Sequence, residues 1–281
     1  MSKIFQNQRF GQERALYNMS NISVINCQID GIEDGESAIK ECNNVYVKDT
    51  FFNLRYPLWC CNNIVMENCE MTDMCRSPIW YSHNMKVTNC KLDCVKIFRF
   101  CSNIEISNCN INSIEFAWRA DQFKMENCTI ESEYPFLGAT NVTVKNCTFN
   151  TKYPFQQAKH CYLENVTIDA KDAFWDSEDI VCKNCTLIGD YLAWYSKNLV
   201  LIDCTIISSQ PLCYANELTV TNCNMEKCDL AFEYSSVNAT INSSIISVKN
   251  PSSGNITAKH IGEVILGNSV YPSNATIVSE E

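Results

Sequence analysis

The stretch that decides the fold is NIEISNCNI, which occupies Asn103–Ile111. Nineteen residues later the chain reads QFKMENCTI from Gln122 to Ile130, and nineteen residues after that it reads NVTVKNCTF from Asn141 to Phe149. Each copy alternates apolar and polar residues around an Asn–Cys pair. A constant step of this kind is typical of stacked supersecondary units, each of which buries an apolar face against its neighbours.

The cysteine of each copy marks a reference position along the chain. The period-two alternation and the many β-branched residues favour strands over helices. We therefore predict an all-β fold, a parallel β-helix of about 13 short coils with roughly 19 residues each. The reference positions are Cys27, Thr50, Cys69, Cys90, Cys109, Cys128, Cys147, Val166, Cys185, Cys204 and Cys223, with weaker copies at Ser244 and Ser269.

The residue before the cysteine is almost always Asn or Asp. Apolar residues precede it at positions such as Ile104 and Ile106, and another follows at Ile111, so the inward parity of the strand changes at Asn108. A single residue in the left-handed conformation produces such a bend, and Asn tolerates that conformation well. We predict that these side chains stack as an asparagine ladder at the strand spacing of about 4.8 Å, with the cysteines stacked inside as small hydrophobes.

The repeat predicts one domain over residues 1–281. Residues 1–18 are expected to form an N-terminal cap, residues 19–244 the regular coils, and residues 245–281 the C-terminal coils and cap. Caps are expected because an open coil end exposes unpaired strand edges.

Composition limits the classes of function. The chain has 281 residues, a net charge of −10 and a pI of about 4.9, which argues against general nucleic-acid binding. The opening residues contain no apolar run typical of a signal peptide, and no stretch is apolar enough to span a bilayer. We expect a soluble, cytoplasmic protein without a membrane partner, in which the nineteen cysteines stay mostly reduced.

Several other motifs follow from the repeat. Cys182 and Cys185 form a CxxC pair, but both fall on inward positions and no second pair accompanies them. The three histidines form no Ser/His/Asp arrangement. We predict no metal and no cofactor. Asn-X-Thr sequons, which the ladder explains without glycosylation, occur at Asn127, Asn141, Asn146, Asn165 and Asn184.

The segment five to ten residues after the reference position is rich in aromatic and charged residues. Because the coils stack, these segments form one side of the β-helix, where aromatic rings can stack on sugars and Arg or Lys can hold carboxylates. The candidate ligand-binding residues are Arg55, Tyr56, Trp59, Arg76, Trp80, Lys96, Arg99, Trp118, Lys152, Tyr153, Trp175, Asp190, Tyr191 and Trp194.

The same segment supplies weak catalytic candidates. If positions six and ten after the cysteine face outward, they form same-face pairs, and two carboxylates at about 5 to 9 Å could serve a glycosidase. The alternative register turns other residues outward, and in a purely structural interpretation the rings fill the interior while the charges pair between coils. The candidates are Glu115 with Arg119, Asp172 with Asp176, Asp229 with Glu233, and Lys171.

The sequence resembles the right-handed, single-stranded parallel β-helices of the pectin-lyase-like class. It is more closely similar to a bacterial family known as a domain of unknown function, of the DUF3737 type. This second resemblance rests on the phrases ERALYN, GESAIK, RYPLW, KDAFW, QPLCY, DLAFEYS and SVKNPSSG. It implies the fold and no activity. The wider class includes pectate lyases, polygalacturonases and silent binding rods, but the calcium-binding Asp cluster and the polygalacturonase phrases are not found in this sequence.

Two hypotheses of function follow. The first is a carbohydrate-interacting protein with an oligosaccharide partner, acting as a polysaccharide lyase or glycoside hydrolase if it is an enzyme. The alternative is a non-catalytic scaffold or protein-interaction β-helix, in which the same face binds a partner or a second copy in a homo-oligomer. The net negative charge favours neutral or basic partners over polyuronates.

Overall fold

The chain folds into β-strands that stack in coils, and the computed structural model describes residues 3–32 and 35–281. Its contacts divide it into two compact units, unit 1 (residues 1–143) and unit 2 (residues 144–281), which we describe one by one. That the whole chain is a single domain stays a prediction. Among the described residues, no helix is long and apolar enough to cross a membrane.

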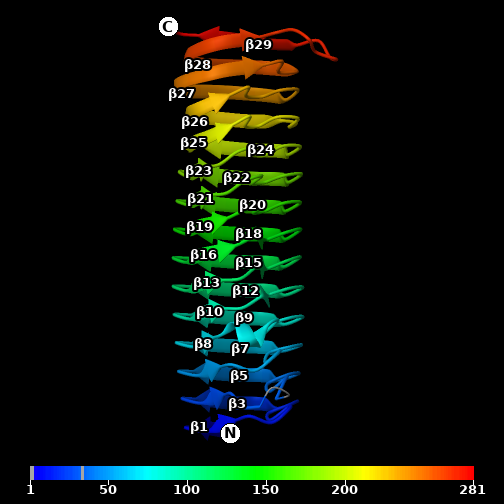
Figure 1. Cartoon of the computed structure of the whole chain (residues 1–281), viewed down its shortest axis with the longest axis vertical. Coiled ribbons are helices and arrows are strands. Elements are labelled where there is room, and N and C mark those ends of the chain that lie inside the picture. The colour runs from blue at the N-terminus through cyan, green and yellow to red at the C-terminus, as the bar shows by residue number, and fades with distance from the viewer. Residues whose placement is uncertain (1–2, 33–34) are drawn as a thin grey trace. The chain divides into compact units, whose positions relative to one another are not determined.

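Unit 1 is a right-handed parallel β-helix whose strands follow one another in stacked coils (Figure 1). Its first strands are β1 (Lys3–Gln6), β3 (Ser20–Ile25), β5 (Asn43–Lys48), β7 (Asn62–Glu67), β9 (His83–Thr88), β12 (Ser102–Ser107) and β15 (Asp121–Glu126). Its second strands are β2 (Arg9–Phe10), β4 (Gln28–Ile29), β6 (Phe51–Phe52), β8 (Glu70–Met71), β10 (Lys91–Asp93), β13 (Asn110–Asn112) and β16 (Thr129–Ser132). A third side carries β11 (Lys96–Ile97), β14 (Glu115–Phe116), β17 (Tyr134–Pro135) and one 3-10 turn, η1 (Asp73–Cys75). β18 (Thr140–Lys145) contains the boundary between the units.

Unit 2 has the same architecture. Its first strands are β20 (Lys159–Glu164), β22 (Glu178–Lys183) and β24 (Lys197–Ile202), and its second strands are β19 (Thr148–Thr151), β21 (Thr167–Asp169), β23 (Thr186–Ile188) and β25 (Thr205–Ser209). Towards the C-terminus the first and second strands merge into β26 (Leu218–Asp229), β27 (Ser236–Lys249) and β28 (Ser253–Ile265), which β29 (Asn274–Ser279) follows.

The pairing register reproduces the nineteen-residue step. In unit 1, Ser102 of β12 pairs with His83 of β9 and with Asp121 of β15, and every pairing is parallel. In unit 2, Glu178 of β22 pairs with Lys159 and Lys197 in the same way. The predicted parallel β-helix is therefore confirmed.

The segments predicted as caps also form coils. β1 pairs in parallel with β3, and β2 pairs with β4, so the described part of residues 1–18 makes a coil of its own; Met1 and Ser2 lie outside the described residues. At the other end, β28 and β29 continue the parallel pairing of β27 through residues 245–281.

The residue before each reference position from Cys27 to Cys223 has the predicted left-handed conformation. In unit 1, φ is +54° at Asn108, and in unit 2 it is +52° at Asn146. The side chains bond from coil to coil: in unit 1 the amide of Asn68 donates to Asp49 Oδ1 at 3.1 Å, and in unit 2 the amide of Asn184 donates to Asn165 Oδ1 at 2.7 Å. The bend turns the following cysteine inward.

The reference cysteines do more than fill space. In unit 1, Cys90 Sγ accepts a hydrogen bond from the backbone N–H of Cys69 at 3.3 Å, and its thiol donates to the carbonyl of Thr88 at 3.3 Å. Two coils earlier, Thr50 Oγ1 replaces the sulfur, accepting from Cys27 N at 3.3 Å and donating to Lys48 O at 2.9 Å. These buried side chains therefore satisfy backbone groups at the bend.

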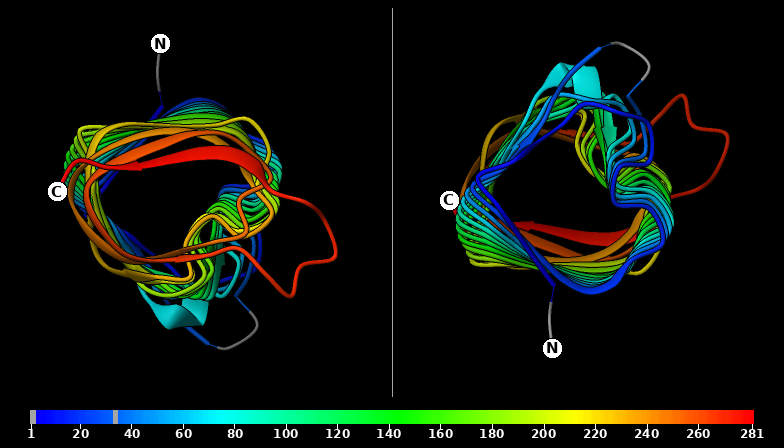
Figure 2. Two further views of the ribbon diagram at one scale, coloured as in Figure 1. Left: turned by 90° about the horizontal axis from the view of Figure 1, so that it is seen from above. Right: turned by 90° about the horizontal axis from the view of Figure 1, so that it is seen from below.

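The third side bends inward, and in unit 2 it is not a strand. Figure 2 shows an inward bend of the backbone on this side of the coils. In unit 1 the bend contains buried phenylalanines in the left-handed conformation, with φ of +58° at Phe98 and +62° at Phe136. In unit 2 the corresponding segment is a series of turns that includes Phe174, at φ +61°. Among the described residues, the third side therefore forms short strands only in unit 1.

We expect that Asn146→Ala lowers the free energy of unfolding by about 1–2 kcal/mol. Asn146 Oδ1 accepts from the amide of Asn165 at 3.0 Å, and Ala tolerates a φ of +52° poorly. Chemical denaturation of the purified protein would measure the change.

The matched control is Asn150→Ala on the same coil. Asn150 is exposed on β19, has no positive φ, and makes no side-chain hydrogen bond to any described residue. Equal effects of the two substitutions would contradict the role of the bend.

Candidate functional site

In unit 1 the third side carries two columns of flat side chains. The tryptophan column of unit 1 consists of Trp59, Trp80, Arg99 and Trp118, and the edge column of unit 1 consists of Tyr81, Phe100 and Arg119. Trp59 and Trp80 stack with centroids 5.2 Å apart at 1°, and Tyr81 and Phe100 stack at 5.3 Å and 2°. Consecutive coils place these rings one strand spacing apart, which is near the distance for ring stacking.

Arg99 occupies a tryptophan position in its column. Its strand position pairs with that of Trp80, and its guanidinium lies 5.1 Å from the Trp80 ring and 5.0 Å from the Trp118 ring. Arg119 likewise continues the edge column, with its guanidinium 5.8 Å from the Phe100 ring. Planar guanidinium groups therefore substitute for rings in both columns.

The indole N–H groups hold the tryptophan column in place. Trp118 Nε1 donates to the carbonyl of Tyr134 at 2.6 Å, and Trp80 Nε1 donates to that of Lys96 at 3.3 Å. Each indole thus spans from its own coil to the next. These rings are rigid, and their N–H groups are not available to a ligand.

Glu115 is bracketed by cations. Its carboxylate lies 3.0 Å from Lys96 Nζ and 3.5 Å from Arg99 Nη1, while its own side chain is 15% exposed. The predicted partner Arg119 is exposed and has no ion-pair partner among the described residues, so the structure does not bring Glu115 and Arg119 together as a salt bridge.

The remaining candidates of unit 1 lie at the start of the columns. Tyr56 packs on Trp59 at 4.9 Å, and Arg55 lies 3.7 Å from Glu36. Arg76 is exposed, and its carbonyl accepts from the backbone N–H of Lys96 at 2.8 Å, which places the two residues on adjacent coils.

Unit 2 has corresponding columns with a different composition. Trp175 and Trp194 stack at 5.6 Å, and Trp194 Nε1 donates to the carbonyl of Gln210 at 2.7 Å. A tyrosine column runs beside them, with neighbouring centroids 5.0 and 5.6 Å apart, and it consists of Tyr195, Tyr214 and Tyr234. Tyr191 packs against Trp194 at 5.2 Å, and Lys171 Nζ lies 5.5 Å from the Tyr191 ring.

Most carboxylates of unit 2 on this side have a structural partner. The contacts are Asp176 with Gln157 Nε2 at 3.3 Å, Asp190 with Ser209 Oγ at 2.8 Å, Asp229 with Ser247 Oγ at 2.6 Å, and Glu233 with Lys249 Nζ at 2.8 Å. Asp172 differs, since burial raises the pKa of its carboxyl, and the nearby charge of Lys171 opposes that rise. Lys152 is exposed and Tyr153 half-buried on the same side.

The outward positions are now defined. Positions six, nine and ten after the reference cysteine face out, whereas seven and eight are buried, as Phe116 and Ala117 illustrate. The sequence predicted an aromatic and charged segment on this side, but it did not predict that rings recur at position ten. Tyr81 and Tyr195 were missed, although they are the most exposed rings of the columns, at 45% and 47%. Aromatic residues recurring at position ten could have revealed them.

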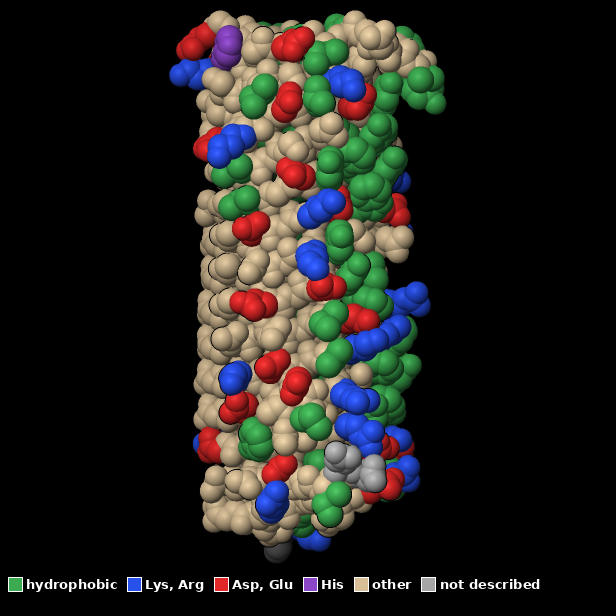
Figure 3. All heavy atoms as spheres, in the orientation of Figure 1, with side chains coloured by type: hydrophobic (Ala, Val, Ile, Leu, Met, Phe, Trp, Pro, Cys, Tyr) green, Lys and Arg blue, Asp and Glu red, His purple; other side chains and the backbone are tan. Residues whose placement is uncertain are grey.

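Figure 3 shows how these side chains gather on the surface. In the part of the view that draws unit 1, hydrophobic side chains and those of Lys and Arg lie together along one edge. The columns defined above supply aromatic and cationic groups of this kind on the third side of unit 1.

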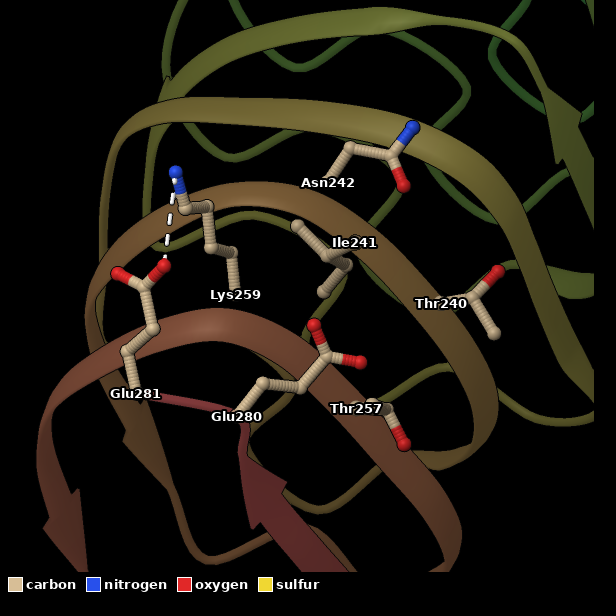
Figure 4. Close-up of a pocket in the computed structure, with 7 residues that line it drawn as sticks. All are labelled: Thr240, Ile241, Asn242, Thr257, Lys259, Glu280 and Glu281. Carbon is tan, nitrogen blue, oxygen red and sulfur yellow. Dashed lines mark ion pairs between the residues drawn. The ribbon is translucent and has the colours of Figure 1, made fainter.

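Other parts of the molecule are weaker candidates for a functional site. Figure 4 shows a pocket of unit 2 lined by β27, β28 and the residues after β29, where Lys259 Nζ lies 3.7 Å from Glu281. Both side chains are exposed, so the ion pair contributes little to stability.

Among the described residues, no group of three or more His, Cys, Asp or Glu side chains could hold a metal ion. Burial raises the pKa of the Cys101 thiol to about 12, which keeps it protonated and unreactive.

Comparison with known protein families identifies the family of the chain. Residues 3–279 match the family described as "Protein of unknown function (DUF3737)". The chain belongs to this family. No curated protein matches this DUF3737 protein.

Solved structures similar to this DUF3737 protein include three kinds of protein. A tailspike protein of E. coli bacteriophage HK620 in complex with a pentasaccharide is 10% identical, with 98% of this chain and 70% of that chain covered and a TM-score of 0.48. The Streptococcus pneumoniae surface protein and adhesin PfbA is 9% identical, with 92% and 83% covered and a TM-score of 0.40. The A-module of the Azotobacter vinelandii mannuronan C-5 epimerase AlgE4 is 10% identical, with 99% and 89% covered and a TM-score of 0.36.

These similarities are distant. The DUF3737 chain spans 59% of the length of the HK620 tailspike protein solved with a hexasaccharide. At such identities and TM-scores they carry no argument about function, which must come from the site itself.

We expect Asp172→Asn to raise the melting temperature at pH 7 more than at pH 3. Because the pKa of Asp172 is raised by folding, ionisation costs folding free energy above that pKa. Below the ordinary pKa of the unfolded chain both states are protonated, and the cost vanishes. Thermal unfolding at the two pH values measures the difference.

Asp169→Asn, at an exposed position of β21, is the control and should show no such difference between the two pH values. The φ of Asp172 is +52°, so Asn could stabilise the turn at any pH, and only the pH-dependent part of the gain reports the carboxyl. A gain of equal size at pH 3 and pH 7 would show that burial of the charge is unimportant.

Proposed function

We propose that this DUF3737 protein binds carbohydrate without catalysing its breakdown, and that an oligosaccharide lies along the third side of unit 1. The observation that supports this most directly is the pair of columns on that side. Trp80, Arg99 and Trp118 repeat a flat, rigid group on each coil, with Tyr81 and Phe100 beside them. Rings and guanidinium groups are the side chains that contact sugars most effectively.

The periodicity of the columns favours a linear ligand. The consecutive coils of unit 1 from Trp59 to Trp118 present similar groups at the strand spacing of about 4.8 Å. A chain of repeating sugar units can meet several of these sets in succession, and each further contact adds to the affinity. Since the indoles are already fixed by bonds such as that of Trp118 to Tyr134, little side-chain entropy is lost on binding.

The engagement of the carboxylates argues for binding rather than catalysis. A general acid or base must be free to exchange a proton with the substrate. Glu115 is held by Lys96 and Arg99 in unit 1, and Asp229 and Glu233 are held by Ser247 and Lys249 in unit 2. These contacts have a structural explanation that needs no reaction.

One observation favours the alternative, a scaffold that binds another protein. The rings in the columns cover one another's faces, as the 1° stack of Trp59 on Trp80 illustrates, so a sugar would meet mainly their edges. The exposed ring of Tyr81 is therefore the decisive one to test.

We expect Tyr81→Ala to weaken oligosaccharide binding about tenfold, because it removes the most exposed ring of unit 1's columns and uncovers one face of Phe100. A glycan array identifies a bound oligosaccharide, and isothermal titration with that oligosaccharide measures the affinity of each variant.

Tyr46→Ala is the matched control. It removes a half-buried ring from β5, a first strand that lies on another side of the coil, and should leave the affinity unchanged. An array on which no glycan is bound would sink the proposal and leave the scaffold as the better hypothesis.

A further inference from the structure

We infer that the ligand of unit 1 is an acidic oligosaccharide, whose carboxylate or sulfate groups are held by the basic cluster Arg76, Lys96, Arg99 and Arg119. This inference rests on the proposed function and names the class of its ligand. The net charge of the chain favours neutral or basic partners, but the local charge of this side of unit 1 has the opposite sign.

The basic cluster surrounds a single carboxylate. Lys96 and Arg99 both contact Glu115, and each cation lies one coil or less from the next. These four cations outnumber the one carboxylate that two of them contact, in a protein whose net charge is −10. Such a local excess attracts an anion even when the whole protein is acidic.

Two of the cations have no internal partner. Arg76 and Arg119 are exposed, and neither has an ion pair with any described residue. Arg119 is held over the Phe100 ring at 5.8 Å, so its guanidinium is positioned although its charge is not compensated. A guanidinium held this way can bond a carboxylate or sulfate through two N–H groups at once.

Arg99 also has N–H donors that make no hydrogen bond to a described residue. Its guanidinium is held between Trp80 and Trp118, and its single bond among the described residues runs from Nη1 to Glu115 over 3.5 Å. The buried Nε has no acceptor. A stacked guanidinium that is desolvated and incompletely bonded gains more from an anionic acceptor than a hydrated surface lysine does.

Unit 2 offers an internal contrast. Its equivalent side carries Asp172 and Asp176 where unit 1 carries Glu115 and Arg119, and it adds Asp190. The exposed cations Lys152 and Lys171 lie on the same side but are outnumbered by these three carboxylates, so this side of unit 2 is less favourable for acidic sugars. The chemistry of the side chains assigns the anionic groups of the ligand to unit 1.

The test compares ligands of one length that differ in charge. Galacturonate hexasaccharide and its methyl ester share their shape, so their difference in affinity reports the carboxylates. We expect the acid to bind at least about tenfold more tightly than the ester, and binding to weaken as salt is added. A chondroitin sulfate hexasaccharide shows whether sulfate serves as well, and maltohexaose is the neutral reference.

Two double variants test the residues. Arg76→Gln with Arg119→Gln should reduce affinity for the acidic hexasaccharide about tenfold or more, and affinity for the neutral one by a clearly smaller factor. Lys86→Gln with Lys124→Gln removes the same charge from the exposed first strands β9 and β15 and should have less than about a twofold effect. Thermal unfolding confirms that each variant is folded.

The outcomes separate this inference from the proposed function. If the ester or maltohexaose binds as tightly as the acid, the protein binds carbohydrate but the anionic class is wrong. Equal binding of poly-L-glutamate would mean that the cluster recognises charge without sugar, which also overturns the inference. If no acidic or neutral glycan binds, the proposed function and the inference fail together.

Discussion

The structure depends on one backbone constraint, a residue in the left-handed conformation just before the reference position of each coil from Cys27 to Cys223. Without it, a strand keeps its alternation, and the side chains one and three residues past the bend would point away from the interior. With it, Asn108 stays on the surface, Cys109 turns inward and Ile111 becomes a core residue. Asn is suited to the position because its amide can bond the amide of the neighbouring coil while its backbone takes a conformation that other residues resist.

The sequence predicted this bend because a chemical signal accompanies it, the Asn–Cys pair. A second left-handed residue, at the start of the first strand, escaped prediction. Asn84 and Asn103 are two residues of this kind, and the amide of Asn103 donates to Asn84 Oδ1 at 2.6 Å. In the sequence, however, such polar residues look like ordinary exposed strand ends. The third side was harder still. Phe98 and Phe136 have positive φ although bulky residues avoid it, so local propensity points the wrong way and only the packing of the stack decides.

The sequence indicated which segment carries the aromatic and charged residues, but not how their side chains are arranged in space. Composition identified Trp80, Arg99 and Trp118 as residues of one side, yet nothing in the sequence indicated that the arginine would take the place of a ring between two indoles. That geometry depends on the register between coils, where Trp80 pairs with Arg99. The role of the cysteines was likewise underestimated: they were expected to be small hydrophobes, and they also bond the backbone, which explains why Thr50 can replace one of them.

The thiol and hydroxyl bonds at the bend have a consequence for how the chain can change in length. In unit 2 the reference positions from Cys147 to Cys223 are nineteen residues apart, and each column requires its member at the same offset. Adding or removing one residue would misalign the columns that follow it in that coil, unless a local turn absorbs the change, as η1 does for the two extra residues between Cys69 and Trp80 in unit 1. Duplicating a whole coil would keep them all and lengthen the surface by one more set of the same groups. Such a protein can therefore change its length in units of one whole coil. The surface that contacts a linear ligand lengthens by the same step, while the packing of the core stays the same.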